Sequence, residues 1–149
     1  MTPQSGRVEG GTHLFPLRVY FEDTDAGGIV YYANYLKFAE RARTELLRLS
    51  GVNQSDLSRQ HRVALTVRSC SIDYLAPARL DDLLEVRSRL VGVGGATITA
   101  EQEIKRDGEV LARLDVRVAC VKLDGGPARL PRELKAVLET YLETDCTEH

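Results

Sequence analysis

The chain has 149 residues, of which 43% are hydrophobic and 28% charged, and its 20 basic and 22 acidic side chains leave a formal net charge of −2. This composition is typical of one globular domain and argues against a disordered chain. The balanced charge excludes a general attraction to nucleic acid, so no nucleic-acid partner is expected. No apolar run reaches transmembrane length and the N-terminus lacks a signal peptide, so we expect a cytoplasmic protein.

Cysteine and histidine spacing gives no sign of a disulfide framework or a metal centre. The cysteines Cys70, Cys120 and Cys146 are odd in number, far apart and without a CxxC pair, which favours reduced thiols. The three histidines have no metal-ligand spacing to one another or to a cysteine. The sequence therefore predicts no metal and no separate cofactor.

The N-terminal third of the chain predicts an arm, a strand and a long helix. Residues 1–14 are polar and rich in glycine, which favours a flexible arm. Residues 17–21 form a short strand candidate. Residues 34–50 have helical spacing, with Asn34 as the expected N-cap and Gly51 as the residue that ends the helix. The predicted apolar face consists of Tyr35, Phe38, Ala39, Ala42, Leu46 and Leu49.

The rest of the chain predicts four strands and a final helix. Apolar residues alternate from Val63, and their phase flips by Cys70, which indicates a bulge in one long strand. Further alternating runs lie within residues 84–90, 98–104 and 110–120, and Asp107-Gly108 between the last two is a hairpin signal. A helical pattern follows from Pro131 to Leu142, and residues 143–149 are an expected flexible tail. This order predicts an α+β fold with an antiparallel five-stranded sheet over one long central helix, and a C-terminal helix.

The densest chemistry lies in residues 22–34. Three carboxylates, Glu22, Asp23 and Asp25, precede Gly27-Gly28. The start of a helix just after them directs free backbone N–H groups into the same loop, where they can stabilise an oxyanion. A carboxylate beside such donors, without a serine or cysteine nucleophile, suits hydrolysis of an activated acyl group such as a thioester. The structural alternative is that the acids only cap the helix and stabilise its dipole.

Three segments resemble the hotdog-fold acyl-CoA thioesterases. Residues 19–35 read VYFEDTDAGGIVYYANY, residues 38–45 read FAERARTE, and residues 74–82 read YLAPARLDD. The first segment is long and ungapped, so it is a specific match. It is most similar to the Tol–Pal-associated branch, with kinship to the hydroxybenzoyl-CoA thioesterases. The resemblance implies a single hotdog domain over residues 15–142.

The resemblance also implies roles for individual residues. Asp25 matches the catalytic carboxylate, the backbone N–H of Tyr32 matches the donor to the thioester carbonyl, and Gly28 belongs to the same loop. In the family, two segments contact the pantetheine arm of the substrate, and a neighbouring subunit contributes one of them. The matching residues in this chain are Leu65, Thr66 and Val67 in the first segment and Gly94, Gly95, Ala96 and Thr97 in the second. Coenzyme A enters as part of an acyl-CoA substrate, and the subunits form a homo-oligomer, a dimer or a homotetramer, with sites at the interfaces. Acyl carrier protein is a possible second acyl donor.

Two departures from the family pattern keep alternatives open. Many relatives carry histidine where this chain has Tyr32, and many carry arginine or lysine in the loop that matches Gly92–Gly95. Arg68 and Arg106 are candidates for the phosphates of coenzyme A. The tyrosine leaves a non-catalytic acyl-CoA or acyl-carrier binding module as an alternative. A hotdog dehydratase is a further one, and it requires His13 or His61 within reach of Asp25.

Overall fold

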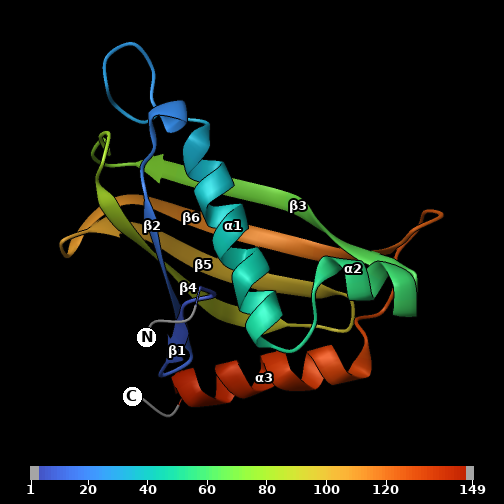
Figure 1. Ribbon diagram of the computed structural model, residues 1–149. Coiled ribbons are helices and arrows are strands. Elements are labelled where there is room, and N and C mark those ends of the chain that lie inside the picture. The colour runs from blue at the N-terminus through green and yellow to red at the C-terminus, as the bar shows by residue number, and fades with distance from the viewer. Residues whose placement is uncertain (1–3, 147–149) are drawn as a thin grey trace.

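The computed structural model describes residues 4–146, with the side chains of residues 4–142. One antiparallel sheet wraps around helix α1 (Asn34–Leu49), and helix α3 (Arg132–Cys146) crosses the end of the molecule beside the sheet (Figure 1). The strands are β1 (Arg7–Glu9), β2 (Thr12–Arg18), β3 (Val63–Tyr74), β4 (Leu83–Val93), β5 (Thr97–Arg106) and β6 (Glu109–Lys122). Their order in the sheet is β1-β2-β4-β5-β6-β3. The predicted α+β fold is confirmed, with six strands where five were expected.

The additional strand lies in the segment that was expected to be a flexible arm. β1 pairs with the start of β2, with Val8 opposite His13, so the arm prediction is wrong for residues 7–14. The pair of glycines at positions 10 and 11 closes a tight turn instead of loosening the chain. β2 also lies earlier than the predicted residues 17–21, because its pairing with β4 runs from Thr12 to Arg18. At the other end, α3 continues to Cys146, beyond the predicted end at Leu142; residues 147–149 of the expected tail lie outside the described residues.

Helix α1 fills the concave face of the sheet, as its periodicity predicts. Its buried residues are Tyr35, Phe38, Ala39, Ala42, Leu46 and Leu47. Leu47 takes the place expected for Leu49, which is 39% exposed. Apolar side chains of the inner faces of β2, β4, β5 and β6 pack against this stripe, and burial of this kind supplies most of the stability of such a domain.

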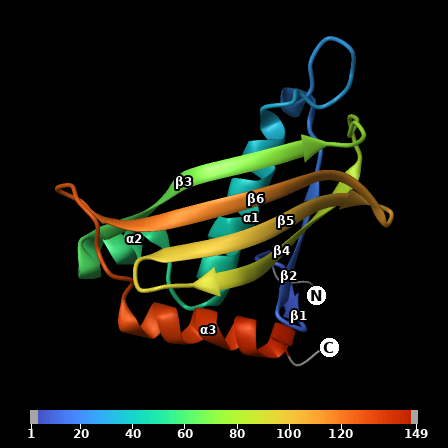
Figure 2. The same cartoon turned by 180° about the vertical axis from the view of Figure 1, so that it is seen from behind.

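β3 forms one edge of the sheet, next to β6 (Figure 2). The predicted bulge is present, since the β3–β6 register shifts between Val67 and Ser69. The chain reaches β3 through a short helix, α2 (Gln54–Asp56), and a π-helical turn, η2 (Leu57–His61). Most residues of β3 after Leu65 are exposed, and an exposed strand edge is available for pairing with another chain. Over the described residues, no helix combines the length and apolarity needed to span a membrane.

Candidate active site

The loop between β2 and α1 folds back on itself at Asp25. The short 3-10 turn η1 (Phe21–Asp23) is followed by a tight turn in which the Gly28 N–H donates to the Asp25 carbonyl oxygen at 3.0 Å. The Asp25 N–H in turn donates to the carbonyl oxygen of Ile29 at 3.0 Å. Gly28 has a φ of +78° and open space around its Cα, so backbone conformation, and not crowding, requires glycine there.

The three carboxylates of the loop have different environments. Asp23 is buried, and its carboxylate accepts hydrogen bonds from the Tyr20 N–H at 2.9 Å and the Asn34 side chain at 3.0 Å. It therefore holds the loop to the start of α1, which matches the structural alternative for the acidic residues. Asp25 is exposed, and one of its oxygens accepts the Gly27 N–H at 2.9 Å. The other oxygen has no partner among the described residues, so this carboxylate is available for chemistry.

The start of α1 provides free backbone donors in the same loop. The N–H groups of Tyr32 and Ala33 donate to no acceptor in the described part of the chain. Ala33, not Asn34, occupies the N-cap position, and no side chain caps it. Asn34 is the first helical residue, and its side chain donates to Asp23 instead of capping the helix. The positive end of the helix dipole therefore faces the loop without a capping group.

A tyrosine cluster borders these donors. The Tyr74 hydroxyl, at the end of β3, donates to the Tyr32 carbonyl oxygen at 3.0 Å. The ring centroids of Tyr32 and Tyr74 lie 6.2 Å apart, and those of Tyr31 and Tyr32 lie 4.8 Å apart. The hydrogen bond with Tyr32 raises the pKa of Tyr31, and burial raises that of Tyr74. Both phenols are therefore neutral near pH 7 and act as hydrogen-bonding groups.

Tyr74 is the site residue that sequence reasoning missed. It stands at the head of the third segment that resembles the family, residues 74–82, but the spacing along the chain gave it no role. Its position next to Tyr32 arises only because the end of β3 lies beside the start of α1.

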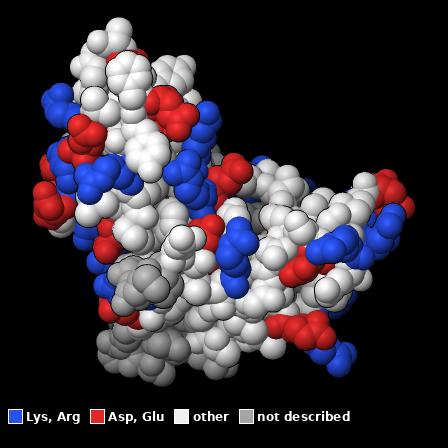
Figure 3. Space-filling model, in the orientation of Figure 1, with Lys and Arg blue, Asp and Glu red and all other residues white. Residues whose placement is uncertain are grey.

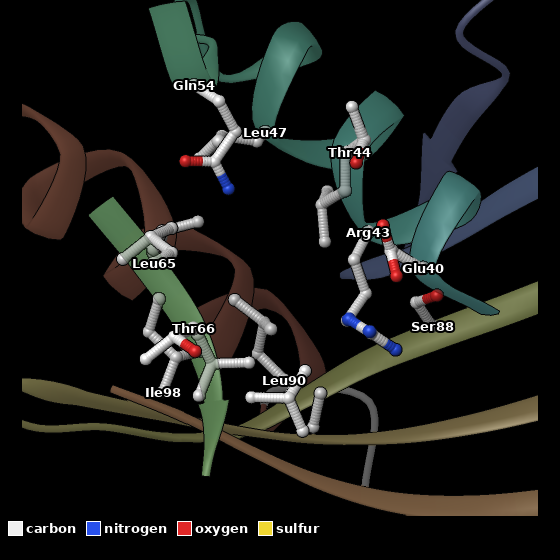
Figure 4. Close-up of a pocket in the computed structure, with 15 residues that line it drawn as sticks. Glu40, Arg43, Thr44, Leu47, Gln54, Leu65, Thr66, Ser88, Leu90 and Ile98 are labelled. Carbon is white, nitrogen blue, oxygen red and sulfur yellow. The ribbon is translucent and has the colours of Figure 1, made fainter. Parts of the chain in front are cut away.

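A cavity of about 440 Å³ lies between the second half of α1 and the sheet (Figure 4). The predicted contact residues Leu65, Thr66 and Val67 line one wall. The other lining side chains are mostly apolar and include Leu46, Leu47, Leu90, Ile98, Ala100 and Leu138. Arg43 reaches into it and donates to the buried Gln102 side chain at 2.8 Å. A cavity of this size and lining is typical of a site for a small apolar group.

The predicted site residues form two separate groups within one chain. The β4–β5 turn consists of Gly94, Gly95, Ala96 and Thr97. A hydrogen bond of 2.7 Å from the Gly94 N–H to the Thr97 carbonyl oxygen holds it. Thr97 lies in register with Ala119, and Ala119 with Thr66, so this turn belongs with the Leu65–Val67 group. Tyr74, beside the Asp25 loop, lies eight residues after Thr66 on β3. At the rise per residue of a strand, this separation is about 26 Å. One chain alone does not bring Asp25 to these contact residues.

The histidines do not complete a dehydratase site. Nε2 of the buried His13 lies 2.7 Å from the Ser5 carbonyl oxygen, and its Nδ1 has no partner among the described residues. His61 ends η2, at the other end of the sheet from Tyr74. Neither forms a hydrogen bond with Asp25, so the observation that the dehydratase alternative requires is missing.

An antiparallel sheet around a central helix, with an available carboxylate in the loop that leads to a free helix N-terminus, is typical of the hotdog-fold thioesterases. The chain belongs to the thioesterase-like superfamily, whose family model matches residues 19–138. It is 49% identical over 123 residues to the acyl-CoA thioesterase YbgC of Haemophilus influenzae, over 82% of this chain and 90% of that protein. It is 44% identical over 129 residues to the acyl-CoA thioester hydrolase YbgC of Escherichia coli O6:H1, over 84% of this chain and 96% of that protein. These similarities to two YbgC proteins confirm the predicted resemblance to the acyl-CoA thioesterases and identify the chain as a thioesterase.

Solved structures show the same fold. A probable thioesterase from Bartonella henselae superposes with a TM-score of 0.78 at 37% identity, over 80% of this chain and 99% of that one. A 1,4-dihydroxy-2-naphthoyl-CoA thioesterase from Synechocystis has a TM-score of 0.79 at 25% identity, over 85% of this chain and 95% of that one. The hotdog fold predicted from the sequence is therefore confirmed.

Proposed function

We propose that the protein hydrolyses acyl-CoA thioesters to a free acid and coenzyme A, with Asp25 as base or nucleophile. Two groups of the loop before α1 carry this proposal: among the described residues, one Asp25 oxygen accepts no hydrogen bond and the Tyr32 N–H donates none. The names of the YbgC relatives support the same substrate class. The reaction consumes only water, so no separate cofactor and no metal are required.

The chemical step follows from these two groups. The thioester carbonyl oxygen accepts a hydrogen bond from the Tyr32 N–H, which stabilises the negative charge that develops as the carbonyl is attacked. Asp25 either takes a proton from the attacking water or attacks the carbonyl carbon itself, forming an anhydride that water then opens. The C–S bond breaks, and the departing thiolate takes up a proton. Incorporation of ¹⁸O from labelled water into the Asp25 carboxylate distinguishes the direct attack.

The site is complete only in a homodimer. We propose that the exposed edges of two β3 strands pair antiparallel, which places the Tyr74 end of one strand beside the Val63–Val67 end of the other. The Asp25 loop of one subunit then faces Leu65–Val67 and the Gly94–Thr97 turn of its neighbour. Exposed apolar side chains on β3, including Val67 at 45%, become buried in this arrangement. Tyr20 and Phe21, 61% and 80% exposed, are available for pairing two dimers as a homotetramer. A cytoplasmic location belongs to the same proposal.

Release of free coenzyme A from an acyl-CoA panel of increasing chain length tests the activity. We expect Asp25→Asn to lower kcat at least about a hundredfold, because the variant lacks the general base or nucleophile. Glu22→Gln is the matched control, since it removes a neighbouring exposed carboxylate and should retain activity. A protein-only blank corrects for the cysteine thiols of the chain. Equal turnover by wild type and Asp25→Asn would refute the role of Asp25.

The alternative is a non-catalytic acyl-CoA or acyl-carrier binding module of the same fold. The observation that favours it is Tyr32, a tyrosine at the position where many relatives carry histidine, because a phenol is a poorer general base than an imidazole. Binding of acyl-CoA without turnover at any chain length would support the binding module. Faster hydrolysis of an acyl-carrier-protein thioester than of acyl-CoA would instead identify the carrier protein as the acyl donor. The proposed hydrolysis by Asp25 would then still apply.

A further inference from the structure

The cavity between α1 and the sheet contains a cation in a mostly apolar wall. Arg43, on α1, is half-buried and extends toward the sheet (Figure 4). Among the described residues that line the cavity, only Glu40 also carries a charge. An arginine side chain remains protonated at neutral pH. The proposed hydrolysis by Asp25 makes no use of this positive charge.

A buried amide fixes the direction of the Arg43 side chain. Gln102, 1% exposed, donates its side-chain N–H groups to the Ala39 carbonyl oxygen at 3.0 Å and to the Ser88 hydroxyl at 2.9 Å. Because a backbone carbonyl oxygen only accepts, the amide nitrogen must face Ala39. The amide oxygen is left to face Arg43, and it accepts an N–H of the guanidinium at 2.8 Å. The guanidinium is therefore held at one place in the cavity.

The rest of this guanidinium has no acceptor in the part of the chain that the structure describes. Arg43 donates one side-chain hydrogen bond, to Gln102, and forms no ion pair there. Glu40 is exposed and lies beyond ion-pair distance of it. Burial lowers the pKa of Arg43, against smaller opposing effects of Cys70 and Glu40. A positive charge removed from water is unfavourable unless an anion compensates it.

The surface around the cavity does not supply that anion. Acidic and basic side chains are intermingled over α1 (Figure 3), and Glu45 on this helix already pairs with Arg48. A ligand that enters the cavity must therefore bring the negative charge. A carboxylate fits this requirement, because its two oxygens match two parallel N–H groups of a guanidinium.

The cavity lies next to the place where the proposed hydrolysis occurs. One wall consists of Leu65–Val67, which faces the Asp25 loop of the neighbouring subunit in the proposed dimer. Arg43 lies on the opposite side of the cavity from this wall (Figure 4). The other lining side chains are mostly apolar, among them Leu47 and Leu90. An acyl chain that enters from the wall therefore passes hydrocarbon side chains and reaches the guanidinium with its far end.

We propose that Arg43 selects acyl chains that end in a carboxylate, so that the preferred substrate is a coenzyme A monothioester of a short dicarboxylic acid. This inference rests on the proposed acyl-CoA hydrolysis and adds the acyl class to it. A cavity of about 440 Å³ accommodates an acyl group of about six carbons. Arg43 binds the end of the chain that does not react, so it determines specificity and takes no part in the chemical step.

Two thioesters that differ at the far end of the acyl chain test this inference. Adipoyl-CoA has a carboxylate at the sixth carbon, where hexanoyl-CoA has a methyl group. The wild type should cleave adipoyl-CoA with a kcat/KM at least about tenfold higher, which is the contribution of hydrogen bonds to a charged group. Arg43→Gln should remove this preference, mainly through KM for adipoyl-CoA, and leave kcat/KM for hexanoyl-CoA unchanged.

Three further variants make the test specific. Arg41→Gln is the matched control, because it removes a positive charge from an exposed position of the same helix. Glu40→Gln should lower KM for adipoyl-CoA about two- to threefold, since it removes a like charge from the cavity. Arg43→Lys keeps the charge without the paired N–H groups and should retain part of the preference. The last two variants decide the question if Arg43→Gln does not fold.

A merely structural role of Arg43 would affect both thioesters alike. Equal losses with adipoyl-CoA and hexanoyl-CoA in Arg43→Gln would therefore overturn the inference. The same loss of preference in Arg41→Gln, or a wild type without any preference, would also overturn it.

Binding of two thioethers that cannot be hydrolysed decides independently of turnover. S-(5-carboxypentyl)-CoA and S-hexyl-CoA differ in the same terminal group. Calorimetry should show that the wild type binds the first at least about fivefold more tightly, and that Arg43→Gln binds both equally. A wild type that cleaves neither thioester would refute the proposed function, while this difference in affinity would still support the role of Arg43. Equal affinities in the wild type would overturn the inference even if both thioesters are cleaved.

Discussion

Tyr74 on the edge strand β3 donates a hydrogen bond of 3.0 Å to the carbonyl oxygen of Tyr32, at the entrance to α1. The acceptor belongs to the peptide unit directly after the one whose N–H faces the proposed site. The bond therefore restrains the backbone that positions this N–H. Because β3 is also the proposed dimer edge, the same side chain connects subunit pairing with the geometry of the donor.

Tyr74→Phe should lower kcat about two- to tenfold with little change in KM, since a single hydrogen bond contributes about 0.5–1.5 kcal/mol. Tyr74 is a positioning residue, so the split between kcat and KM is the informative measurement. Tyr31→Phe is the control, because it leaves the Tyr74–Tyr32 hydrogen bond intact. A rise in KM alone, or equal losses in both variants, would contradict the positioning role.

Gly28→Ala should impair activity through the shape of the Asp25 turn. The φ of Gly28 is +78°, and a side chain in this conformation costs about 1–2 kcal/mol. The turn relieves that strain by moving Asp25, so we expect kcat to fall while the melting temperature changes by only a few degrees. Gly92→Ala is the control, since the nearest atom to an added Cβ is 3.8 Å away there. Wild-type kcat in Gly28→Ala would show that the turn geometry is not needed.

Two inactive variants should complement each other if the site is shared between subunits. Asp25→Asn disables the loop, and Thr66→Trp obstructs the wall that the partner contributes. In mixed dimers one of the two sites has both parts intact, so co-expression should restore about a quarter of wild-type activity. Co-purification of both variants through an affinity tag carried by only one of them confirms that mixed dimers form. Mixed dimers without activity would place both parts of the site in one chain.

Stability should fall at acidic pH because of His13. Burial lowers its pKa below the ordinary value of 6.5, against smaller opposing effects of the Ser5 hydrogen bond and of Glu45. The folded protein therefore keeps His13 neutral, while the unfolded chain takes up a proton below about pH 6.5. The free energy of unfolding contributed by this group is fully present above that pH and decreases as the pH falls, by up to about 1.4 kcal/mol per pH unit.

Chemical denaturation between pH 7.5 and 5 measures this effect. His13→Gln should lose much of the pH dependence of the wild type, although it also lowers stability at neutral pH. His61→Gln is the control, because His61 is exposed and should leave the slope unchanged. The same slope in His13→Gln as in the wild type would assign the acid sensitivity to other groups.

Local patterns in the sequence determined the central helix, the hairpin at Asp107-Gly108 and the bulge after Val67. Each depends on interactions over a few residues, such as the 3.6-residue repeat of α1 or the left-handed conformations of Asp107 and Gly108. The resemblance around Asp25 likewise lies within one short segment. For that reason these features, and the family, were predictable from the chain alone.

Only the tertiary structure decided which carboxylate is available and which residues surround it. Asp23 and Asp25 look alike in sequence, but Asp23 is buried against Asn34 and Asp25 is exposed. Tyr74 reaches Tyr32 across 42 positions of the sequence. These relationships depend on how distant strands pair and how the chain packs on the sheet. Short-range propensity carries no information about such contacts, because their free energy comes from burial and hydrogen bonds between residues far apart in the chain.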